Sequence, residues 1–542
     1  MKEGFRQCMA WLHTWSGLVV GWVLFFVFVT GTVGYFSPEI TRWMQPELPL
    51  QQAVVVPQAQ QALDVALGRL QRNAPGAEFW SITLPHQSLD ARGWQDLAVA
   101  WETLPQEGHE HGVYHSETLD VVTGEQLRRP EPRKTFGGSL LYRMHYSLHY
   151  VPYEVAIRIV GVCTMLMLLA IVTGVITHKK IFRDFFTFRP RKGQRSWLDA
   201  HNVISVMALP FFLMITYSGL VFFTTEYMPG ALAAVYGADD RAIDRYYDDL
   251  YPEEGRHLAV ARPAASVADM VARAEAEWGA GEAVYVTVEH HEGEPAAVVV
   301  GRQRHGQVLH YENPTLRFDA LTGARLPDAP PPGAVLATSD TLFALHEGRF
   351  AGTGLRWLYF VSGLLGCAMI GTGLVLWTVK RRKQHESLGG DAHFGLRLVE
   401  ALNVATIAGL PVAVAAYFWA NRLLPLDMAD RAEWEAHWMF IVWGEILLYA
   451  FLRDTRRAWV EVSWLAAAAY ALLPVVNLLT TDRHLGVTLP AGDWVLAGFD
   501  LTVLALAGVF AVMALRIQRH WFGSRLPGQV PAPSTPTAEA GQ

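Results

Sequence analysis

Eight apolar runs, each about long enough to cross a bilayer, constrain the fold of this chain more than any other feature. They fall at about 14–36, 155–177, 203–224, 356–379, 395–420, 436–452, 458–480 and 493–516. A spanning helix needs about 20 mostly apolar residues because the hydrocarbon core is roughly 30 Å thick. The first run is too long for the apolar part of a signal peptide and no A-x-A site follows it, so we expect a retained membrane anchor.

Composition agrees with a membrane protein that also has sizeable soluble parts. The chain of 542 residues is 51% hydrophobic and only 18% charged. Its net charge of -7 gives no reason to expect a nucleic-acid partner, whereas the apolar runs imply contact with a lipid bilayer. There are 3 cysteines and no C-x-x-C-H, which argues against covalent haem attachment.

Short basic segments assign the ends of these helices to the two sides of the membrane. They follow the second, fourth, sixth and eighth runs and read HKKIFRDFFTFRPRKGQR, KRRKQH, RDTRR and RIQRH. Because cytoplasmic loops carry an excess of Lys and Arg, we expect all four in the cytoplasm. With an even number of spans, both termini are expected there too.

Two long segments, about 37–140 and 226–340, then face outward and mix alternating strand-like runs with a helical patch. Each closes on a D-x-x-T-G phrase, LDVVTGEQL with Asp120 and FDALTGARL with Asp319, which predicts a tight turn. A histidine and an apolar run follow each phrase. The first 380 residues therefore resemble one unit used twice: helix, outer domain, outer histidine, helix. Such repeats often meet at a pseudo-twofold axis with the functional site between them.

The predicted fold class is a membrane α-helical bundle of about eight spans with α+β outer domains and an internal duplication. We place the boundaries at 1–36 (first span), 37–140 (outer domain 1), 141–225 (second and third spans with a basic loop), 226–340 (outer domain 2), 341–385 (fourth span), 386–520 (four-span extension) and 521–542 (disordered tail). The extension breaks the repeat, and the sequence leaves its role open between electron input, partner binding and scaffolding.

Two histidines at matching positions of the repeat suggest a shared ligand on the inner side. His13 and His201 each lie at the N-terminal end of a predicted membrane span, in WLHTWSGLVVG and WLDAHNVISV. An imidazole pair can clamp a haem iron, and ligation that fills both axial positions suits electron transfer. A lone interfacial histidine is more often structural, but the matching positions of these two histidines in the repeat favour ligand binding by the pair.

A second matched pair follows the outer domains. His145 in LLYRMHYSLHY and His346 in TLFALHEGRF have equivalent places in the two units. His149, one turn after His145, is a rival outer ligand, and His178 at the cytoplasmic end of the second span is a rival inner ligand. Arg143 and Arg349, near the outer histidines, are candidates for holding haem propionates or an anionic substrate. Two noncovalent bis-histidine b haems, one near each side, would divide the roughly 30 Å hydrocarbon core into steps that an electron can tunnel.

Several of these motifs together resemble a known family. WLHTWSGLVVG, the D-x-x-T-G outer segments, LLYRMHYSLHY and TGLVLWTVKRR are similar to the PepSY-associated transmembrane family over about 1–385. HKKIFRDFFTFRPRKGQRSWLDAHN resembles the iron-uptake branch, the FoxB-type ferrisiderophore reductases of bacterial inner membranes. The resemblance implies PepSY-like periplasmic domains and a dihaem cytochrome b that passes electrons to the periplasm. There it would reduce ferric iron in a siderophore and release ferrous iron.

The electron donor and the acceptor stay open at this point. No G-x-G-x-x-G follows a predicted strand, so we expect the donor to be a quinol or a separate cytoplasmic reductase. One alternative function is a PepSY-type regulator of a periplasmic protease or sensor, which leaves the paired histidines unexplained. Others are an inward transporter, for which the spans carry few buried charges, and electron transfer to a non-iron acceptor.

Overall fold

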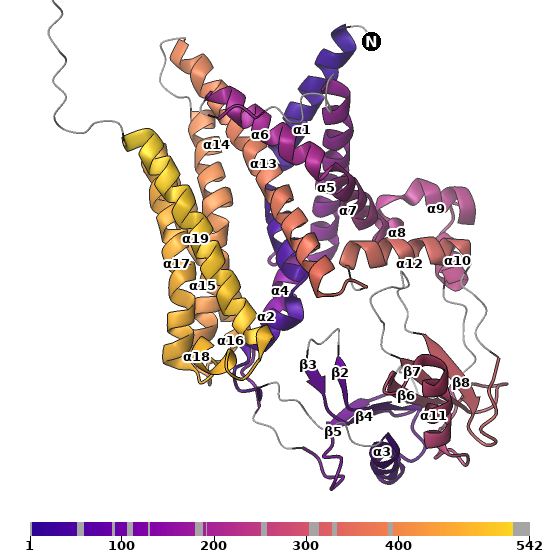
Figure 1. Ribbon diagram of the computed structural model, residues 1–542. Helices are drawn as coiled ribbons and strands as arrows, with labels where there is room; N and C mark the ends of the chain where they lie inside the picture. The colour runs from indigo at the N-terminus through magenta and orange to yellow at the C-terminus, as the bar shows by residue number, and fades with distance from the viewer. Residues whose placement is uncertain are drawn as a thin grey trace, which may run out of the picture.

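Seven candidate membrane crossings, with an eighth if one bent helix pair is a single span, dominate the structure, a computed structural model (Figure 1). It describes residues 3–50, 59–88, 93–105, 112–127, 131–178, 188–190, 192–250, 257–302, 314–327, 333–348, 350–387 and 394–523. Within these residues, seven crossings are long apolar helices or helix runs and the eighth is a bent pair. The seven are α1 (Glu3–Gly34), α5 (Tyr153–Thr177), α13 (Thr353–Ser387), α14 (Phe394–Val404) continued by η1 (Ala405–Gly409) and α15 (Leu410–Leu423), α16 (Arg431–Leu452), α17 (Thr455–Thr480) and α19 (Trp494–Phe522). The eight predicted runs are thus confirmed as helices; most of the predicted tail, 524–542, lies outside the described residues.

The third crossing bends by 67° between α6 (Gln194–Met207) and α7 (Leu209–Val221). Pro210 stands in the first turn of α7 and has no N–H to give to the preceding turn, so the helix cannot continue straight. The two helices on either side of the bend have different roles. His201 belongs to α6, whereas α7 packs against α12 (Ala334–Glu347).

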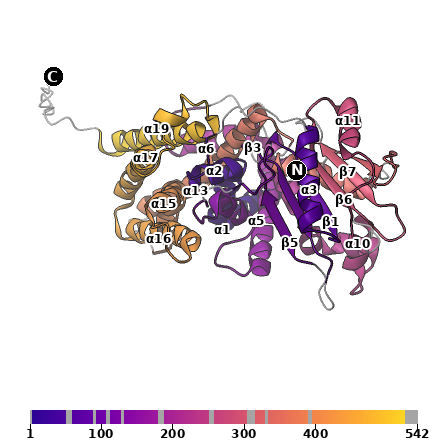
Figure 2. The same cartoon turned by 90° about the horizontal axis from the view of Figure 1, so that it is seen from below.

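The two outward segments share one antiparallel sheet, at the end of the bundle opposite the N-terminus (Figures 1 and 2). The strand order is β5-β4-β1-β6-β7-β8, and the first segment joins the second through β1 and β6, with Ser81 opposite Thr287. The strands are β1 (Phe79–Thr83), β4 (Ala98–Glu102), β5 (Tyr114–Thr118), β6 (Ala283–Glu289), β7 (Ala297–Arg302) and β8 (Thr315–Asp319), and a separate hairpin holds β2 (His86–Ser88) and β3 (Gly93–Gln95). Alternate residues of β1, β4, β6 and β8 are buried, as expected for a sheet covered on one face.

Two helices, α3 (Ala59–Asn73) and α11 (Val267–Trp278), contribute to the hydrophobic core of this domain. Both D-x-x-T-G phrases form the predicted turns. The Asp120 carboxylate accepts hydrogen bonds from the backbone N–H of Val122 and Thr123, at 2.9 and 2.7 Å, and Gly124 has a φ of +71° that favours glycine. Asp319 and Gly323 repeat this arrangement.

Short helices connect the sheet to the membrane helices. They are α2 (Ser37–Met44), α4 (Gly137–Met144), α8 (Thr224–Tyr227), α9 (Pro229–Tyr236), α10 (Ala242–Leu250) and α12, with α18 (Leu485–Thr488) at the end of the C-terminal bundle. The last four crossings form that bundle, which lies beside the other helices on the side away from the sheet (Figures 1 and 2).

Buried polar contacts fix the C-terminal bundle to α2 and to the segment that enters α4. The Trp43 indole donates to Asp500 at 3.0 Å, and the Tyr417 hydroxyl donates to the Gly137 carbonyl at 2.9 Å. Arg133 donates to the Asn421 carbonyl at 2.6 Å. α4 ends at Met144, directly before His145, so these contacts also help to fix the position of that candidate ligand.

Candidate cofactor sites between paired histidines

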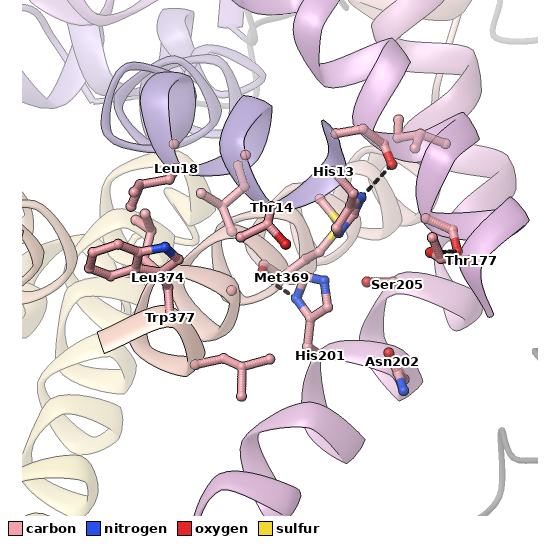
Figure 3. Close-up of a pocket in the computed structure, with 18 of the residues that line it drawn as sticks. His13, Thr14, Leu18, Thr177, His201, Asn202, Ser205, Met369, Leu374 and Trp377 are labelled. Carbon is pink, nitrogen blue, oxygen red and sulfur yellow. Dashed lines mark hydrogen bonds between the residues drawn. The ribbon is translucent and has the colours of Figure 1, made fainter. Parts of the chain in front are cut away.

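An inner cavity of about 510 Å³ lies between α1, α5, α6 and α13. The rings of His13 on α1 and His201 on α6 project into it, with their centroids 6.3 Å apart and their planes inclined at 67° (Figure 3). These helices are far apart in the sequence, and the structure brings the two predicted inner ligands together.

An outer cavity of about 380 Å³ lies nearer the sheet. His145, at the end of α4, and His346, on α12, both line it, and their ring centroids are 5.8 Å apart with an interplanar angle of 41°. Its wall is largely aromatic and includes Tyr146 and Tyr227. Burial raises the pKa of the Tyr227 phenol, which therefore stays protonated and donates to the Ile157 carbonyl at 2.6 Å.

All four histidines are held through the same ring nitrogen, Nδ1. For three of them it bonds a backbone carbonyl: His13 to Ala170 at 2.8 Å, His201 to Met369 at 2.9 Å and His145 to Val27 at 2.9 Å. The Nδ1 of His346 lies 3.0 Å from the Ser218 hydroxyl, and the ring also bonds the backbone of Ile215. A carbonyl acceptor places the ring hydrogen on Nδ1 and leaves Nε2 as the basic nitrogen, which is how metal-binding histidines are commonly oriented.

A glycine lies under each of these rings, four residues after the residue whose backbone bonds the ring: Ala170, Met369, Val27 and Ile215. A Cβ atom would stand 2.9 Å from His346 Cε1 at Gly219, 3.1 Å from His13 Cε1 at Gly174 and 3.3 Å from His201 Cε1 at Gly373, and at Gly31 it would overlap the His145 ring. Four residues make about one helical turn, so acceptor and glycine share a helix face.

The sequence carries a signal for the positions of these glycines. Each follows a small hydroxyl residue: Thr30, Thr173, Ser218 and Thr372. Each of those hydroxyls donates back to the carbonyl four residues earlier, at 2.7 or 2.8 Å. Each hydroxyl hydrogen is thus used within its own helix, and the Ser218 oxygen is left to accept from Nδ1 of His346. The sequence analysis did not single out these glycines, and a small hydroxyl residue followed by glycine within an apolar run is the signal that could have found them.

The two cavities share a wall. Leu24 and Met167 line both, and Phe28 of the outer cavity meets Phe212 of the inner one edge to face at 6.3 Å. These side chains are apolar, so they exclude water from the boundary between the two sites.

The ring separations fit two imidazoles on opposite sides of one metal ion. A metal–imidazole bond of about 2 Å, plus about 1 Å from the bonding nitrogen to the ring centre, places the centroids of two such rings about 6 Å apart. In the described part of the chain, no three His, Cys, Asp or Glu side chains converge on a metal. The histidine pairs therefore offer two axial ligands each, and a metal held there must bring its equatorial ligands with it, as iron in a porphyrin does.

The other predicted site residues lie elsewhere. His149 does not line the outer cavity; it pairs with Glu433 at 3.3 Å and stacks on Phe440 of the C-terminal bundle. The exposed Arg143 is also outside the cavity wall, with its guanidinium 5.2 Å from the centre of the Phe136 ring. His178 lines the inner cavity but is bonded to Asn202 at 3.0 Å. Arg349 lies outside the described residues.

Comparison with known proteins places this geometry in a family. The model of the PepSY-associated TM region matches residues 10–380, which is more than half of the chain and includes all four paired histidines. The chain belongs to the PepSY-associated TM family. A relative from Pseudomonas aeruginosa, described as an uncharacterized protein, is 26% identical over 402 residues, which cover 71% of this chain and 95% of the relative.

The family match covers only the first part of the chain, so the chain has a matched region and a C-terminal part beyond it. Both cavities lie within the matched region, whereas α14 to α19 lie beyond its end at residue 380. The family and the long apolar helices together make this a multi-pass membrane protein in contact with the lipid bilayer.

Proposed function

We propose that this protein is an inner-membrane dihaem b-type oxidoreductase that passes electrons across the membrane to reduce ferric siderophore in the periplasm and release ferrous iron. The observation that carries the proposal is the pair of adjacent cavities, each facing two histidines whose Nδ1 atoms are already engaged. Iron bound by two imidazoles has no open coordination position and exchanges single electrons.

The cavities have the size and character that a large flat apolar cofactor needs. Their volumes of about 510 and 380 Å³ lie within the range of roughly 300–1,000 Å³ that is common for small-molecule sites. The chain supplies neutral imidazoles, which cost less to place in a membrane than charged ligands. The glycines leave room for the rings, and the carbonyl acceptors set their orientation.

The shared wall supports transfer between the sites rather than two separate functions. Leu24 and Met167 touch both cavities, so only one layer of side chains separates them. In a dry apolar boundary no polar solvent has to reorganise around a moving charge. The cavity of His13 and His201 is lined also by Lys380, at the basic end of α13. His145 and His346 belong to α4 and α12, which lie at the end of the bundle nearer the sheet (Figure 1).

The direction of transfer follows from the positive-inside rule. The basic end of α13 belongs in the cytoplasm, which places both termini there and the sheet in the periplasm. Electrons would enter near His13 and His201 from a quinol or a cytoplasmic reductase and leave near His145 and His346. One electron converts the ferric ion of a siderophore to ferrous iron, which binds hard oxygen ligands less tightly.

The test is spectroscopic and then functional. The purified protein should show reduced b-type Soret and α bands with two haems per chain. After chemical reduction, a ferric hydroxamate siderophore should reoxidise it, with one ferrous ion trapped for each electron lost. His437→Ala serves as a matched control, because His437 bonds Tyr150 at 2.6 Å and lines neither cavity. A wild-type protein without haem would overturn the proposal; haem that no ferric chelate oxidises would overturn its iron part.

A further inference from the structure

The inner cavity has polar atoms on its wall that no protein group satisfies. Three are buried without a hydrogen-bond partner: Trp377 Nε1, His178 Nδ1 and Ser205 Oγ. A buried polar group left unpaired costs free energy, and the great majority in folded proteins have partners. Figure 3 shows Trp377 on one side of the His13 and His201 rings and Ser205 with Asn202 on the other.

Trp377 differs in this respect from five tryptophans in the described residues whose indoles are hydrogen-bonded. The indoles of Trp22, Trp43, Trp80, Trp419 and Trp443 each donate to a protein oxygen at 2.8–3.0 Å. The Trp377 indole instead lines the cavity with its N–H unpaired, and Arg381 lies 5.4 Å from the centre of its ring. An indole nitrogen can only donate, so it requires an acceptor.

His178, which follows the last residue of α5, presents a second donor on the cavity wall. The amide nitrogen of Asn202 is a donor, so Nε2 of His178 accepts the 3.0 Å bond and the neutral ring carries its hydrogen on Nδ1. Lys380, three residues after Trp377, adds a cation to the cavity lining. The described lining of the outer cavity has no Lys or Arg and includes the acidic Glu347.

We infer that Trp377 with Lys380 on α13, and His178 at the end of α5, hold two carboxylates at the rim of the inner cavity, and that these are the propionates of the inner haem. This rests on the proposed function. Two donor positions on opposite helices match a ligand with two carboxylates, and the apolar remainder of the cavity matches its ring. An anionic lipid headgroup would use the same donors, so the experiment has to separate the two sources.

The contact between these residues and the haem propionates is tested by measuring the midpoint potential of the inner haem. A cation beside a propionate favours the reduced, more negative cofactor, so Lys380→Met should shift the one-electron equilibrium about tenfold toward oxidation, which is about 59 mV for one electron. Trp377→Phe should shift it about threefold in the same direction. Both are measured in a His346→Ala background, in which only the inner haem remains.

Matched controls use neighbours that do not line the cavity. Lys383→Met removes a cation one turn further on, and Trp22→Phe removes an indole that donates to Asn403 at 2.9 Å; neither should change the potential. Lys380→Arg should keep it near the wild-type value. If Trp377→Phe fails to fold, the Lys380 pair of variants still decides the question.

Reconstitution with haem dimethyl ester separates the ligand sources. If propionates are the ligands, the effect of Lys380→Met disappears with the ester and persists in vesicles of phosphatidylcholine alone. An effect that persists with the ester but disappears without phosphatidylglycerol identifies a lipid headgroup and overturns the inference. An unchanged potential in a protein that does contain haem also overturns it, whereas absence of haem from the wild type would reject the proposed function instead.

Discussion

Gly219→Ala is the substitution that tests the packing of the histidine rings most sharply. The new methyl group would lie 2.9 Å from Cε1 of His346, closer than carbon atoms approach without strain. A bound metal fixes the position of the His346 ring, so the ring cannot turn away from the added methyl group. Overpacking by one methyl group costs about 1–3 kcal/mol. Since 1.4 kcal/mol is tenfold in an equilibrium constant, the affinity of the outer cavity for haem should fall about fivefold to 150-fold.

The assay is the rate of haem transfer from the purified protein to an excess of apomyoglobin, with the total haem per chain as a second reading. Gly444→Ala is the matched control, because a Cβ atom there has no neighbour within 4 Å. The four glycines should also rank by the space they leave, with Gly31→Ala most damaging and Gly373→Ala, at 3.3 Å, least. Equal haem retention in Gly219→Ala and Gly444→Ala would refute the argument that these glycines make room for ligand rings.

The remaining predictions concern ligation, topology and acid stability. Single alanine substitutions of His13, His201, His145 or His346 should each remove about one haem per chain, as measured by pyridine haemochrome, and retention of both in His13→Ala and His346→Ala would contradict the pairing. Reporter fusions at Gly323 and Arg382 should report periplasm and cytoplasm, and the opposite result at either site would reverse the proposed direction. Hydrogen bonds from the Thr123 and Thr322 backbones lower the pKa of Asp120 and Asp319. Their contribution to stability is therefore complete above the unfolded pKa of about 3.9 and is lost as the pH falls through the lower folded value. The melting temperature of the sheet domain should thus fall less between about pH 5 and pH 3 in the Asp120→Asn, Asp319→Asn double variant than in the wild type.

The membrane helices were predictable because span length and side-chain hydropathy are local properties. The positions of His13 and His201 were predictable for a related reason, since matching flanks place them at matching depth. The bend at Pro210 was not predicted, because 203–224 was interpreted as one run, although proline removes a helix hydrogen bond. The joining of β1 to β6 into one sheet was not anticipated, since no pattern within either segment specifies a partner 200 residues away.

The site shows the same division between local and tertiary information. His149 follows His145 by four residues, and the sequence spacing treated both as lying on one helix face, whereas α4 ends at Met144. The separation comes from the C-terminal bundle, which places Glu433 and Phe440 against His149 and so turns its ring away from the outer cavity. The unpaired donors of Trp377 and His178 are likewise a property of packing, visible only when their neighbours are known.

The central claim is that electrons cross the membrane through this chain to ferric iron. The most direct measurement uses the purified protein in sealed vesicles, oriented with the sheet outside, with a reductant enclosed and a ferric hydroxamate siderophore outside with a ferrous-specific trap. We predict that ferrous iron forms outside at a rate that falls to background in His13→Ala and in His346→Ala and is unchanged in His437→Ala. Ferrous iron forming equally fast in the His13→Ala vesicles, or none forming with a haem-replete wild-type protein, would contradict the account.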